Sequence, residues 1–324
     1  MNDFFEVREV SRWYPVKGKS IFTKSKSFVK AVDQVQLSIS EGEVLGVIGE
    51  SGCGKSTLGR VLVRLEEPSS GDVVLNGVSL GELIKKSSKN FRRNIQIVFQ
   101  NPYDAFTPRD TIEKILLRPL RIHGIGKDDA ERRQLCLQEL RKGGLVPAED
   151  IMKRLPHQLS GGQLQRISII RALMLGPKVL IADEPVSMLD VSVRAEIINM
   201  LLALSKEKNI SILFISHDIA LTRYISNHIA VMYLGRVVEY GPTDEVLLSP
   251  QHPYTQVLVS NYGSLDPLDT TGRIVVKGEP PTPIDPGPGC YFAPRCFKAV
   301  EACFKKYPER HHQTENHYAV CDQI

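Results

Sequence analysis

Residues 49–56 constrain the possible folds of this chain more than any other segment. They read Gly-Glu-Ser-Gly-Cys-Gly-Lys-Ser, with three glycines and a closing lysine–serine pair. The apolar run 44–48 precedes them as a buried strand would, and residues 57–59 are expected to open a helix. A strand, a glycine-rich turn and a helix in this order form a unit that binds phosphate groups. The segment therefore predicts an α/β chain that binds a nucleoside triphosphate.

Each residue type in this segment has a chemical purpose. Glycines allow a tight turn that brings backbone N–H groups onto the β-phosphate, at the positive end of the following helix. Lys55 supplies charge to the β- and γ-phosphates, and the Ser56 hydroxyl is a ligand for Mg²⁺. A glycine-rich turn that fits by chance is the alternative, and the flanking strand and helix argue against it. The predicted nucleotide-binding residues here are Gly49, Ser51, Gly52, Cys53, Gly54, Lys55, Ser56 and Thr57.

The composition of the chain limits the classes of function that it could have. The 324 residues suffice for one large domain with an appendage, or for two domains. The net charge of +4 is too weak to indicate nucleic-acid binding but is compatible with a position near an acidic membrane surface. No apolar run approaches the roughly 18 residues of a membrane-spanning helix, and the first residues are acidic where a signal peptide would be basic. These features predict a cytosolic protein whose cysteines are reduced or metal-bound.

The rest of the chain supports an α/β core followed by a small appendage. Further strands are expected at 4–10, 31–39, 95–99, 179–182 and 212–215, and a hairpin at 73–77. Continuous apolar runs such as 179–182 and 212–215 are typical of strands buried on both faces of a parallel sheet. Residues 111–145 read as helical and charged. After about residue 250, prolines, glycines and four cysteines accumulate.

Two strand ends carry residues suited to hydrolysis. Asp183 and Glu184 follow the run 179–182, and His217 follows the run 212–215. Asp183 is placed to hold Mg²⁺ or its waters, and Glu184 is a candidate general base for an attacking water. Two surface carboxylates after a strand are the alternative reading. A lone histidine is also usually structural or solvated, but His217 alone of the eight falls at a strand end in register with these motifs.

A second motif, Leu159-Ser160-Gly161-Gly162-Gln163, narrows the possibilities. Together with residues 49–56, Gln100, residues 180–185 and His217, in this order, it resembles the ATPases of ATP-binding-cassette (ABC) proteins. The resemblance covers about residues 4–250. It implies a P-loop NTPase cassette with a mixed or parallel sheet core, an antiparallel β subdomain and a helical subdomain at about 101–176. A C-terminal extension, 251–324, would follow the nucleotide-binding domain at 1–250.

The same resemblance assigns roles to single residues. His217 contacts the γ-phosphate and orients the catalytic water, while Gln100 touches Mg²⁺ or water and relays the nucleotide state to the partner subunit. The segment 187–190 matches the D-loop and keeps its aspartate, Asp190, although alanine is commoner at the position of Met188. Tyr14 is the candidate for stacking on adenine, with Trp13 as the alternative. The residues that would cap ATP held by the opposite subunit are Ser160, Gly161, Gly162 and Gln163.

Further segments resemble the oligopeptide/dipeptide importers, namely 100–103, 107–109, 251–255, 278–282 and 289–296. The insert between Tyr14 and Val32 is similar to that of the second of the two ATPases such importers carry. This implies a peripheral protein at the cytoplasmic face of the membrane that powers peptide import. Its partners would be two permease subunits, a paralogous ATPase or a second copy of itself, and indirectly an external solute-binding protein.

The sequence also bears on three other functions. The importer family includes members that carry nickel or oligosaccharides. A soluble ABC ATPase acting on DNA or ribosomes usually has a coiled-coil insertion or two cassettes in one chain, and neither occurs here. A scaffold subunit that binds ATP without hydrolysing it is disfavoured because Glu184 and His217 are both present.

Four cysteines of the extension, Cys290, Cys296, Cys303 and Cys321, suggest a metal site. Four thiolates suit tetrahedral zinc or a [4Fe–4S] cluster. Structural zinc sites usually contain C-x-x-C pairs, which are missing here, and similar extensions in peptide-type ATPases hold an iron–sulfur cluster. We therefore expect a [4Fe–4S] cluster with a structural role, with zinc and unliganded thiols as alternatives. Cys53 and Cys136 read as lone thiols.

Overall fold

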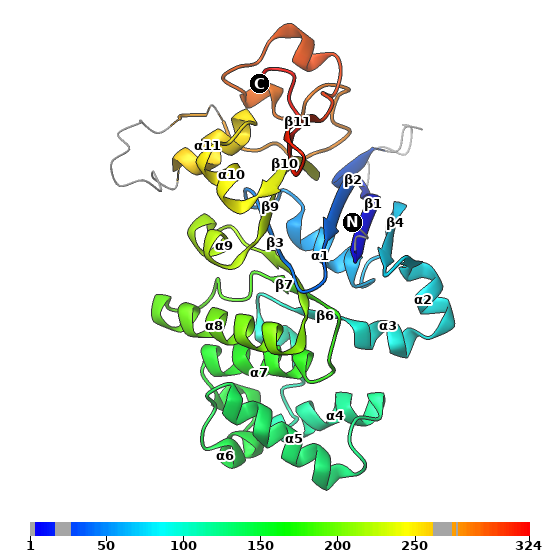
Figure 1. The fold of residues 1–324 in the computed structure, drawn as a ribbon, viewed down its shortest axis with the longest axis vertical. Coiled ribbons are helices and arrows are strands. Elements are labelled where there is room, and N and C mark those ends of the chain that lie inside the picture. Colours follow the sequence, from blue (N-terminus) through cyan, green and yellow to red (C-terminus); the bar gives the residue numbers. More distant parts are fainter. Residues whose placement is uncertain (1–3, 17–26, 262–273, 277) are drawn as a thin grey trace. The chain divides into compact units, whose positions relative to one another are not determined.

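The computed structural model describes residues 4–16, 27–261, 274–276 and 278–324 (Figure 1). Contacts between Cα atoms divide the chain into two compact units. Unit 1 holds residues 1–39, 44–79 and 214–324, and unit 2 holds residues 40–43 and 80–213. Residues 17–26 of the insert noted in the sequence lie outside the described residues.

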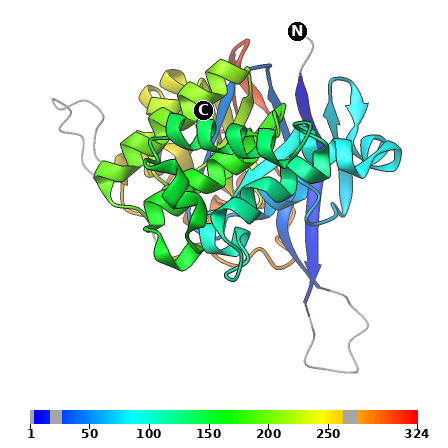
Figure 2. The ribbon, with the colours of Figure 1, turned by 90° about the horizontal axis from the view of Figure 1, so that it is seen from below.

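An antiparallel sheet of unit 1 has the order β2–β1–β4–β5. Side chains of β1 such as Phe5, Val7 and Val10 are buried, and the long β1–β2 ribbon is visible in Figure 2. The hairpin between β4 and β5 turns at Asn76 and Gly77, which have φ values of 50° and 75°, as tight hairpin turns require. The predicted antiparallel sheet is thus confirmed. Its strands are β1 (Phe5–Pro15), β2 (Phe28–Ile39), β4 (Ser70–Leu75) and β5 (Val78–Ser79).

A second set of strands in unit 1 leads into residues 49–56. Strand β3 (Val44–Ile48) is buried throughout and runs parallel to β9 (His228–Tyr233). Beyond β9 the strands continue antiparallel through β10 (Arg236–Pro242) and β12 (His317–Ala319) to β11 (His311–Thr314). The C-terminal hairpin therefore extends the sheet that contains β3. The helices of this unit are α1 (Lys55–Leu62), α9 (Ile219–Ile225), α10 (Thr243–Leu248) and α11 (Pro253–Asn261).

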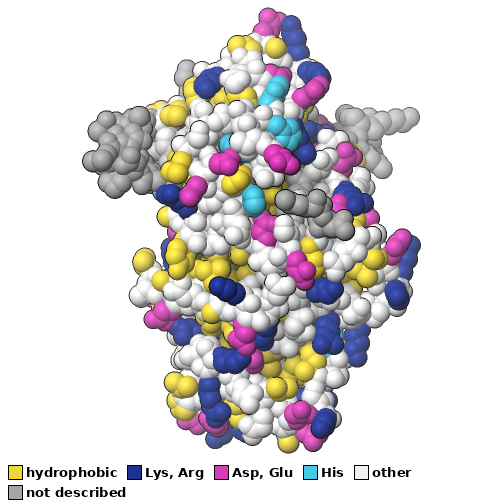
Figure 3. All heavy atoms as spheres, viewed as in Figure 1, with side chains coloured by type: hydrophobic (Ala, Val, Ile, Leu, Met, Phe, Trp, Pro, Cys, Tyr) yellow, Lys and Arg dark blue, Asp and Glu magenta, His cyan; other side chains and the backbone are white. Residues whose placement is uncertain are grey.

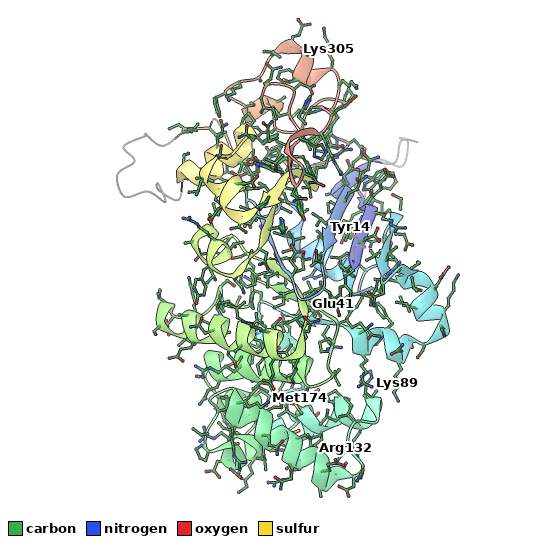
Figure 4. The ribbon with its side chains drawn as sticks, in the orientation of Figure 1. Tyr14, Glu41, Lys89, Arg132, Met174 and Lys305 are labelled. Carbon is green, nitrogen blue, oxygen red and sulfur yellow. The ribbon has the colours of Figure 1, made fainter. Side chains whose placement is uncertain are left out.

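Unit 2 combines a parallel strand pair with most of the helices (Figure 1). Strands β6 (Ile95–Val98) and β7 (Val179–Asp183) pair in parallel, and Val98 lies opposite Ala182. The helices between residues 112 and 173 bury leucines and isoleucines in one core, against which Met174 packs at the end of α7 (Figure 4). The helices are α2 (Leu80–Lys86), α3 (Ser88–Asn94), α4 (Ile112–His123), α5 (Asp129–Lys142), α6 (Ala148–Lys153), α7 (Gly161–Leu173) and α8 (Val191–Lys208).

Several short elements complete the chain. Strand β8 (Ser211–Ile215) contributes residues to both units. The 3₁₀ helices are η1 (Pro102–Ala105), η2 (Pro156–Gln158), η3 (Ala293–Arg295) and η4 (Glu301–Phe304). Within the described part of the chain, no helix combines the length and the apolar character needed to cross a membrane. The predicted α/β core is confirmed by the parallel pairs β3–β9 and β6–β7.

Candidate functional site

The phosphate loop, residues 49–56, joins β3 to α1. Lys55 is only 5% exposed, and its Nζ donates to the carbonyl oxygens of Gly49 at 2.8 Å and Glu50 at 3.0 Å. The ammonium group is therefore folded back over the loop that precedes it. Burial raises the pKa of the Cys53 thiol, so Cys53 stays neutral although the charge of Lys55 opposes the shift.

Two glycines of this loop are required by its geometry. Gly54, the residue before α1, has φ +105°, and a Cβ there would lie 2.0 Å from the carbonyl oxygen of Ala31. A Cβ on Gly49 would lie 2.2 Å from the carbonyl oxygen of Met232. Both contacts are with backbone, which cannot move aside as a side chain can. The spacing of glycines seen in the sequence thus has a steric cause.

His217 lies at the same end of β3 as the phosphate loop. The backbone N–H of Ser216 donates to the carbonyl oxygen of Val47 over 3.1 Å, two residues before the loop begins. His217 follows and is exposed, and Asp218 then caps α9 by accepting the Leu221 N–H at 3.0 Å. The cap ends the segment after β8 at a defined point. His217 and the loop therefore both follow strand ends on the same side of unit 1.

Unit 2 brings Gln100 and Glu184 together. They follow the paired strands β6 and β7, and the Gln100 Nε2 donates to Glu184 Oε2 at 3.1 Å and to Ser187 Oγ at 3.2 Å. The Ser187 hydroxyl in turn donates to the Glu184 carbonyl oxygen at 3.1 Å. Glu184 has φ +45°, an uncommon conformation for a side chain of this size. Such local strain is characteristic of functional sites.

Ser160 and Gln163 hold the start of α7 through a reciprocal cap. The Gln163 N–H donates to Ser160 Oγ at 3.3 Å, and the Ser160 N–H donates to Gln163 Oε1 at 3.1 Å. A Cβ on Gly162 would lie 2.7 Å from Cγ1 of Val193 on α8, so the glycine allows close packing of these helices. The serine, the glycine and the glutamine each have a local structural reason to be there.

These residues also line a pocket of about 430 Å³ within unit 2. One wall is residues 160–163, and another is the D-loop with Met188, Leu189 and Asp190. Arg166 lies in the same pocket and donates to the Gly143 carbonyl oxygen at 3.3 Å. The structure thus brings the predicted signature and D-loop residues to one cavity. The sequence interpretation missed Arg166, whose only signal was its place one turn after the signature.

Tyr14 and Trp13 both lie on β1 and are half-buried; Figure 4 labels Tyr14. The Tyr14 hydroxyl donates to Glu66, and the guanidinium of Arg12 lies 4.6 Å from the ring centroid. Burial raises the pKa of the Tyr14 hydroxyl, and Glu66 raises it further. Trp13 Nε1 instead donates to Asp33 at 3.2 Å. Only part of the Tyr14 surface is therefore accessible to a ligand, and the same holds for Trp13.

The oxygen donors predicted for Mg²⁺ divide between the units. Ser56 lies in unit 1, at the start of α1, whereas Gln100 and Asp183 lie in unit 2. Asp183 ends β7 as a carboxylate that is only 5% exposed. A hydroxyl, an amide oxygen and a carboxylate are ligands that suit Mg²⁺, so the chemistry of the donor set fits the ion. The sequence placed Ser187 in the D-loop without assigning it a role, and in the structure its hydroxyl accepts a hydrogen bond from Gln100.

The predicted [4Fe–4S] cluster is wrong. Cys290, Cys296, Cys303 and Cys321 do line one small pocket, together with His252. Yet over the described ranges, no group of three or more His, Cys, Asp or Glu side chains is arranged to hold a metal ion. The zinc alternative fails on the same grounds.

Sequence comparison identifies two matching families. The ABC transporter family matches residues 32–187, and the C-terminal region of oligopeptide/dipeptide transporters matches residues 238–303. The dipeptide transport ATP-binding protein DppF of Haemophilus influenzae is 44% identical over 97% of this chain and 95% of its own length. The oligopeptide transport ATP-binding protein AppF of Bacillus subtilis is 41% identical over 98% of this chain and 96% of its own.

Solved structures agree on the fold. The ATP-binding cassette MJ0796, in a dimeric post-hydrolysis state bound to ADP and Pi, superposes with a TM-score of 0.64 at 29% identity. It covers 74% of this chain and 98% of its own. CbiO1 of Clostridium perfringens, part of an ABC transporter complex, gives a TM-score of 0.63 at 27% identity over 77% of this chain and 92% of its own. The cassette fold predicted from the sequence is confirmed.

Proposed function

The chain belongs to the ATP-binding subunits of ABC transporters, and from this we propose that it hydrolyses ATP to drive the import of di- and oligopeptides. One observation carries the proposal above the others. The relatives at 41–44% identity span nearly the whole chain, including the C-terminal region typical of oligopeptide/dipeptide transporters. Their names specify dipeptide and oligopeptide transport, and none of these points to nickel or oligosaccharide.

Residues 49–56 would hold the triphosphate. Lys55 is already directed over the loop, and it would exchange its contacts with Gly49 and Glu50 for the phosphate oxygens. Ser56, Asp183 and Gln100 would hold Mg²⁺, which when bound neutralises charge on the phosphates. Tyr14 would stack on the adenine ring.

Glu184 would take the proton of the attacking water. Its carboxylate is positioned by the amide of Gln100, and Gln100 is in turn anchored on Ser187. A base must be held within hydrogen-bond reach of its water, and this network fixes the direction of the carboxylate. His217 would orient the same water against the γ-phosphate. The contact between Gln100 and Glu184 also gives Gln100 a means to report the state of the site.

The signature pocket would complete the site of another ATPase subunit. Its volume of about 430 Å³ and its position at the N-terminus of α7 suit the terminal phosphate of a nucleotide held elsewhere. Ser160, Gly161, Gly162 and Gln163 would contact that phosphate, with Asp190 at the edge of the pocket. Hydrolysis then requires two ATPase subunits, either two copies of this chain or this chain with a paralogue.

A groove of about 440 Å³ in unit 2 is our candidate surface for the two permease subunits. Arg92, Arg118 and Arg171 contribute cationic groups, while Pro119 and Ile122 contribute apolar ones. Ala105 and Thr107, just after Gln100, also line it, so a partner seated there would contact the segment that holds Glu184. The subunit would then act at the cytoplasmic face, with a solute-binding protein outside.

The division of the chain follows from these roles. We assign residues 1–250 to the nucleotide-binding domain, with a helical subdomain at about 101–176, and residues 251–324 to the extension. On the face shown in Figure 3, basic and acidic side chains are interspersed instead of forming one basic patch. This pattern gives no support to a nucleic-acid partner.

Reconstitution tests the proposal directly. The chain, its permease subunits and their binding protein are placed in vesicles, and ATP hydrolysis and solute uptake are measured with a dipeptide, a pentapeptide, Ni²⁺ and an oligosaccharide. Peptide-stimulated hydrolysis with peptide uptake supports the proposal. Stimulation by Ni²⁺ or the oligosaccharide alone would replace peptide with that solute. Full hydrolysis that no permease or solute alters would favour a soluble ATPase.

A further inference from the structure

Glu50, the second residue of the phosphate loop, is held by an arginine from the C-terminal part of the chain. Arg295 donates from Nη1 to Glu50 Oε2 over 2.8 Å and from Nη2 to Oε1 over 3.2 Å. Two parallel hydrogen bonds fix the direction of the carboxylate as well as its distance. Arg295 belongs to η3 and its side chain is 9% exposed, so the contact is largely shielded from water. This is not an ordinary surface ion pair.

The backbone of Glu50 is held from the same side. Its N–H donates to the Tyr254 hydroxyl over 2.8 Å, and Tyr254, on α11, is fully buried. The ring centroid of Tyr254 lies 4.6 Å from that of Tyr233 and 5.4 Å from that of Phe292. Arg295 Nη1 also donates to the Tyr233 hydroxyl at 3.3 Å. The partners of Glu50 are therefore set in a rigid aromatic cluster.

Glu50 also contacts the residue that would bind the phosphates. Its carbonyl oxygen accepts a hydrogen bond from Lys55 Nζ at 3.0 Å. Glu50 thus uses its N–H and carboxylate toward the C-terminal part of the chain and its carbonyl toward Lys55. A displacement of Glu50 would change the position from which Lys55 reaches a phosphate.

The other end of the loop rests on a second anchor. Gly54 lies against the backbone of Ala31 on β2, and two residues further along the strand is Asp33, which is 1% exposed. Asp33 Oδ2 accepts from the Tyr291 hydroxyl at 2.8 Å and from Arg236 Nε at 2.8 Å. Tyr291 and Arg295 both lie within residues 290–296. One C-terminal segment therefore supports the loop at its start and the strand beneath its end.

We propose that Arg295 and Tyr254 are positioning residues of the nucleotide site, acting through Glu50 on the phosphate loop. The inference rests on the proposed role of residues 49–56 in binding triphosphate. Both side chains are already engaged with Glu50, so they act on the loop and are not assigned a contact with the nucleotide. The C-terminal segment and the nucleotide site are then coupled, and a change in residues 290–296 alters the affinity for ATP.

Two substitutions in the full-length chain test the proposal. Arg295→Met removes the charge but keeps much of the side chain, and Tyr254→Phe removes only the hydroxyl. We expect the Kd for ATP to rise about tenfold or more with Arg295→Met and about three- to tenfold with Tyr254→Phe. In the assembled transporter, KM for ATP should rise with little change in kcat. Arg295→Lys should restore part of the affinity.

Controls separate positioning from folding. Arg310→Ala removes an exposed arginine that lies outside residues 290–296, over the Tyr318 ring, and it should leave the Kd unchanged. The single variants Glu50→Gln and Arg295→Met are compared with the double variant that carries both changes. The double variant should bind ATP no more weakly than whichever single variant has the higher Kd, because both changes break one contact. Additive losses would contradict a route through Glu50.

The outcomes also distinguish this inference from the function it rests on. If Lys55→Ala leaves ATP binding intact, the assignment of the phosphate loop fails. If Lys55→Ala abolishes binding while folded Arg295→Met and Tyr254→Phe bind ATP as the unsubstituted chain does, only the inference fails. Should Arg295→Met not fold, Tyr254→Phe decides alone, since its ring packing is retained.

Discussion

The side-chain amide of Gln100 donates a 3.1 Å hydrogen bond to the carboxylate of Glu184. The two residues are far apart in the chain but follow neighbouring parallel strands, β6 and β7, so the sheet itself brings them together. The amide donor orients the carboxylate of Glu184 by bonding to one of its oxygens. The arrangement suits a base that must keep one direction toward its water.

Replacing Glu184 with glutamine should stop hydrolysis without stopping ATP binding. The amide preserves the shape of the side chain and can still accept a bond from Gln100, but it cannot take a proton. We expect the rate of hydrolysis to fall by about 10²-fold or more. Phosphate release by the assembled complex and ATP binding by the isolated chain are the measurements. Glu149→Gln, at a half-buried acid paired with Arg141, is the matched control. Near-normal turnover in Glu184→Gln would exclude it as the base.

Lys55→Ala should weaken triphosphate binding far more than binding of adenosine. The substitution removes the buried cation that would contact the β- and γ-phosphates, while the adenine contact proposed for Tyr14 would be unaffected. A loss of at least about tenfold in ATP affinity is expected from one charge-assisted contact. Calorimetric titration of the isolated chain with ATP and with adenosine measures both. Equal losses for the two ligands would point to a folding defect.

Ser160→Arg should leave ATP binding to the isolated chain intact and prevent pairing of ATPase subunits. An arginine at the mouth of the signature pocket would fill the space proposed for the partner's phosphate. The substitution also removes a helix cap, which costs about 0.5–2 kcal/mol of stability. Ser160→Ala isolates that cost, because it removes the cap but leaves the pocket open. Pairing is followed by light scattering in the presence of ATP with hydrolysis blocked. ATP-dependent pairs in Ser160→Arg would contradict the sandwich arrangement.

The sequence predicted the elements that carry phosphate chemistry because their spacing leaves little freedom. The glycines at 49 and 54 are forced by backbone contacts, and a buried strand such as β3 appears as an unbroken apolar run. The helix start at Ser160 is likewise set by a local contact, the reciprocal cap with Gln163. What the sequence did not predict depends on distant contacts. No local pattern links Glu50 to Arg295, which are 245 residues apart.

At the cysteines of the extension, the sequence predicted a site that the structure does not contain in its described residues. Four thiols within a short segment suggested a metal site, since spacing alone does not reveal how side chains are directed. In the described part of the extension, no three His, Cys, Asp or Glu side chains are arranged to hold a metal ion. Strands β9 and β10 were also missed, because β10 alternates weakly and receives its place by pairing with β9 and β12.

Glu239→Ala should destabilise the C-terminal part of unit 1. Glu239 is fully buried; its carboxylate accepts the N–H groups of Gln251 and His252, each at 2.8 Å, and lies 2.9 Å from His317 Nε2. Alanine would leave these buried groups without their acceptor, which should cost about 3–5 kcal/mol of unfolding free energy. Urea unfolding followed by fluorescence gives the change. The control is Glu245→Ala, an exposed carboxylate 3.5 Å from His317 Nδ1, for which less than about 1 kcal/mol is expected. Similar costs for the two variants would refute the argument.

The buried thiol of Cys136, on α5, should resist alkylation and make stability fall at high pH. Burial raises its pKa to about 12, well above the ordinary value for a thiol, and the charge of Glu113 adds to the shift. Because thiolate is the reactive form, modification at pH 8 should be about 10³-fold slower in the folded chain than in urea.

The same shift in pKa makes the stability of the fold depend on pH. Below about pH 9 the Cys136 thiol is neutral in both the folded and the unfolded state, so its ionisation does not affect stability. Between pH 9 and 12 the unfolded thiol loses its proton while the folded one retains it, so the unfolded state gains and stability decreases. Mass spectrometry of the Cys136 peptide after iodoacetamide treatment measures the first effect, and urea midpoints with and without Cys136→Ser measure the second. If folded Cys136 were labelled at the rate seen in urea, burial would not be protecting this thiol.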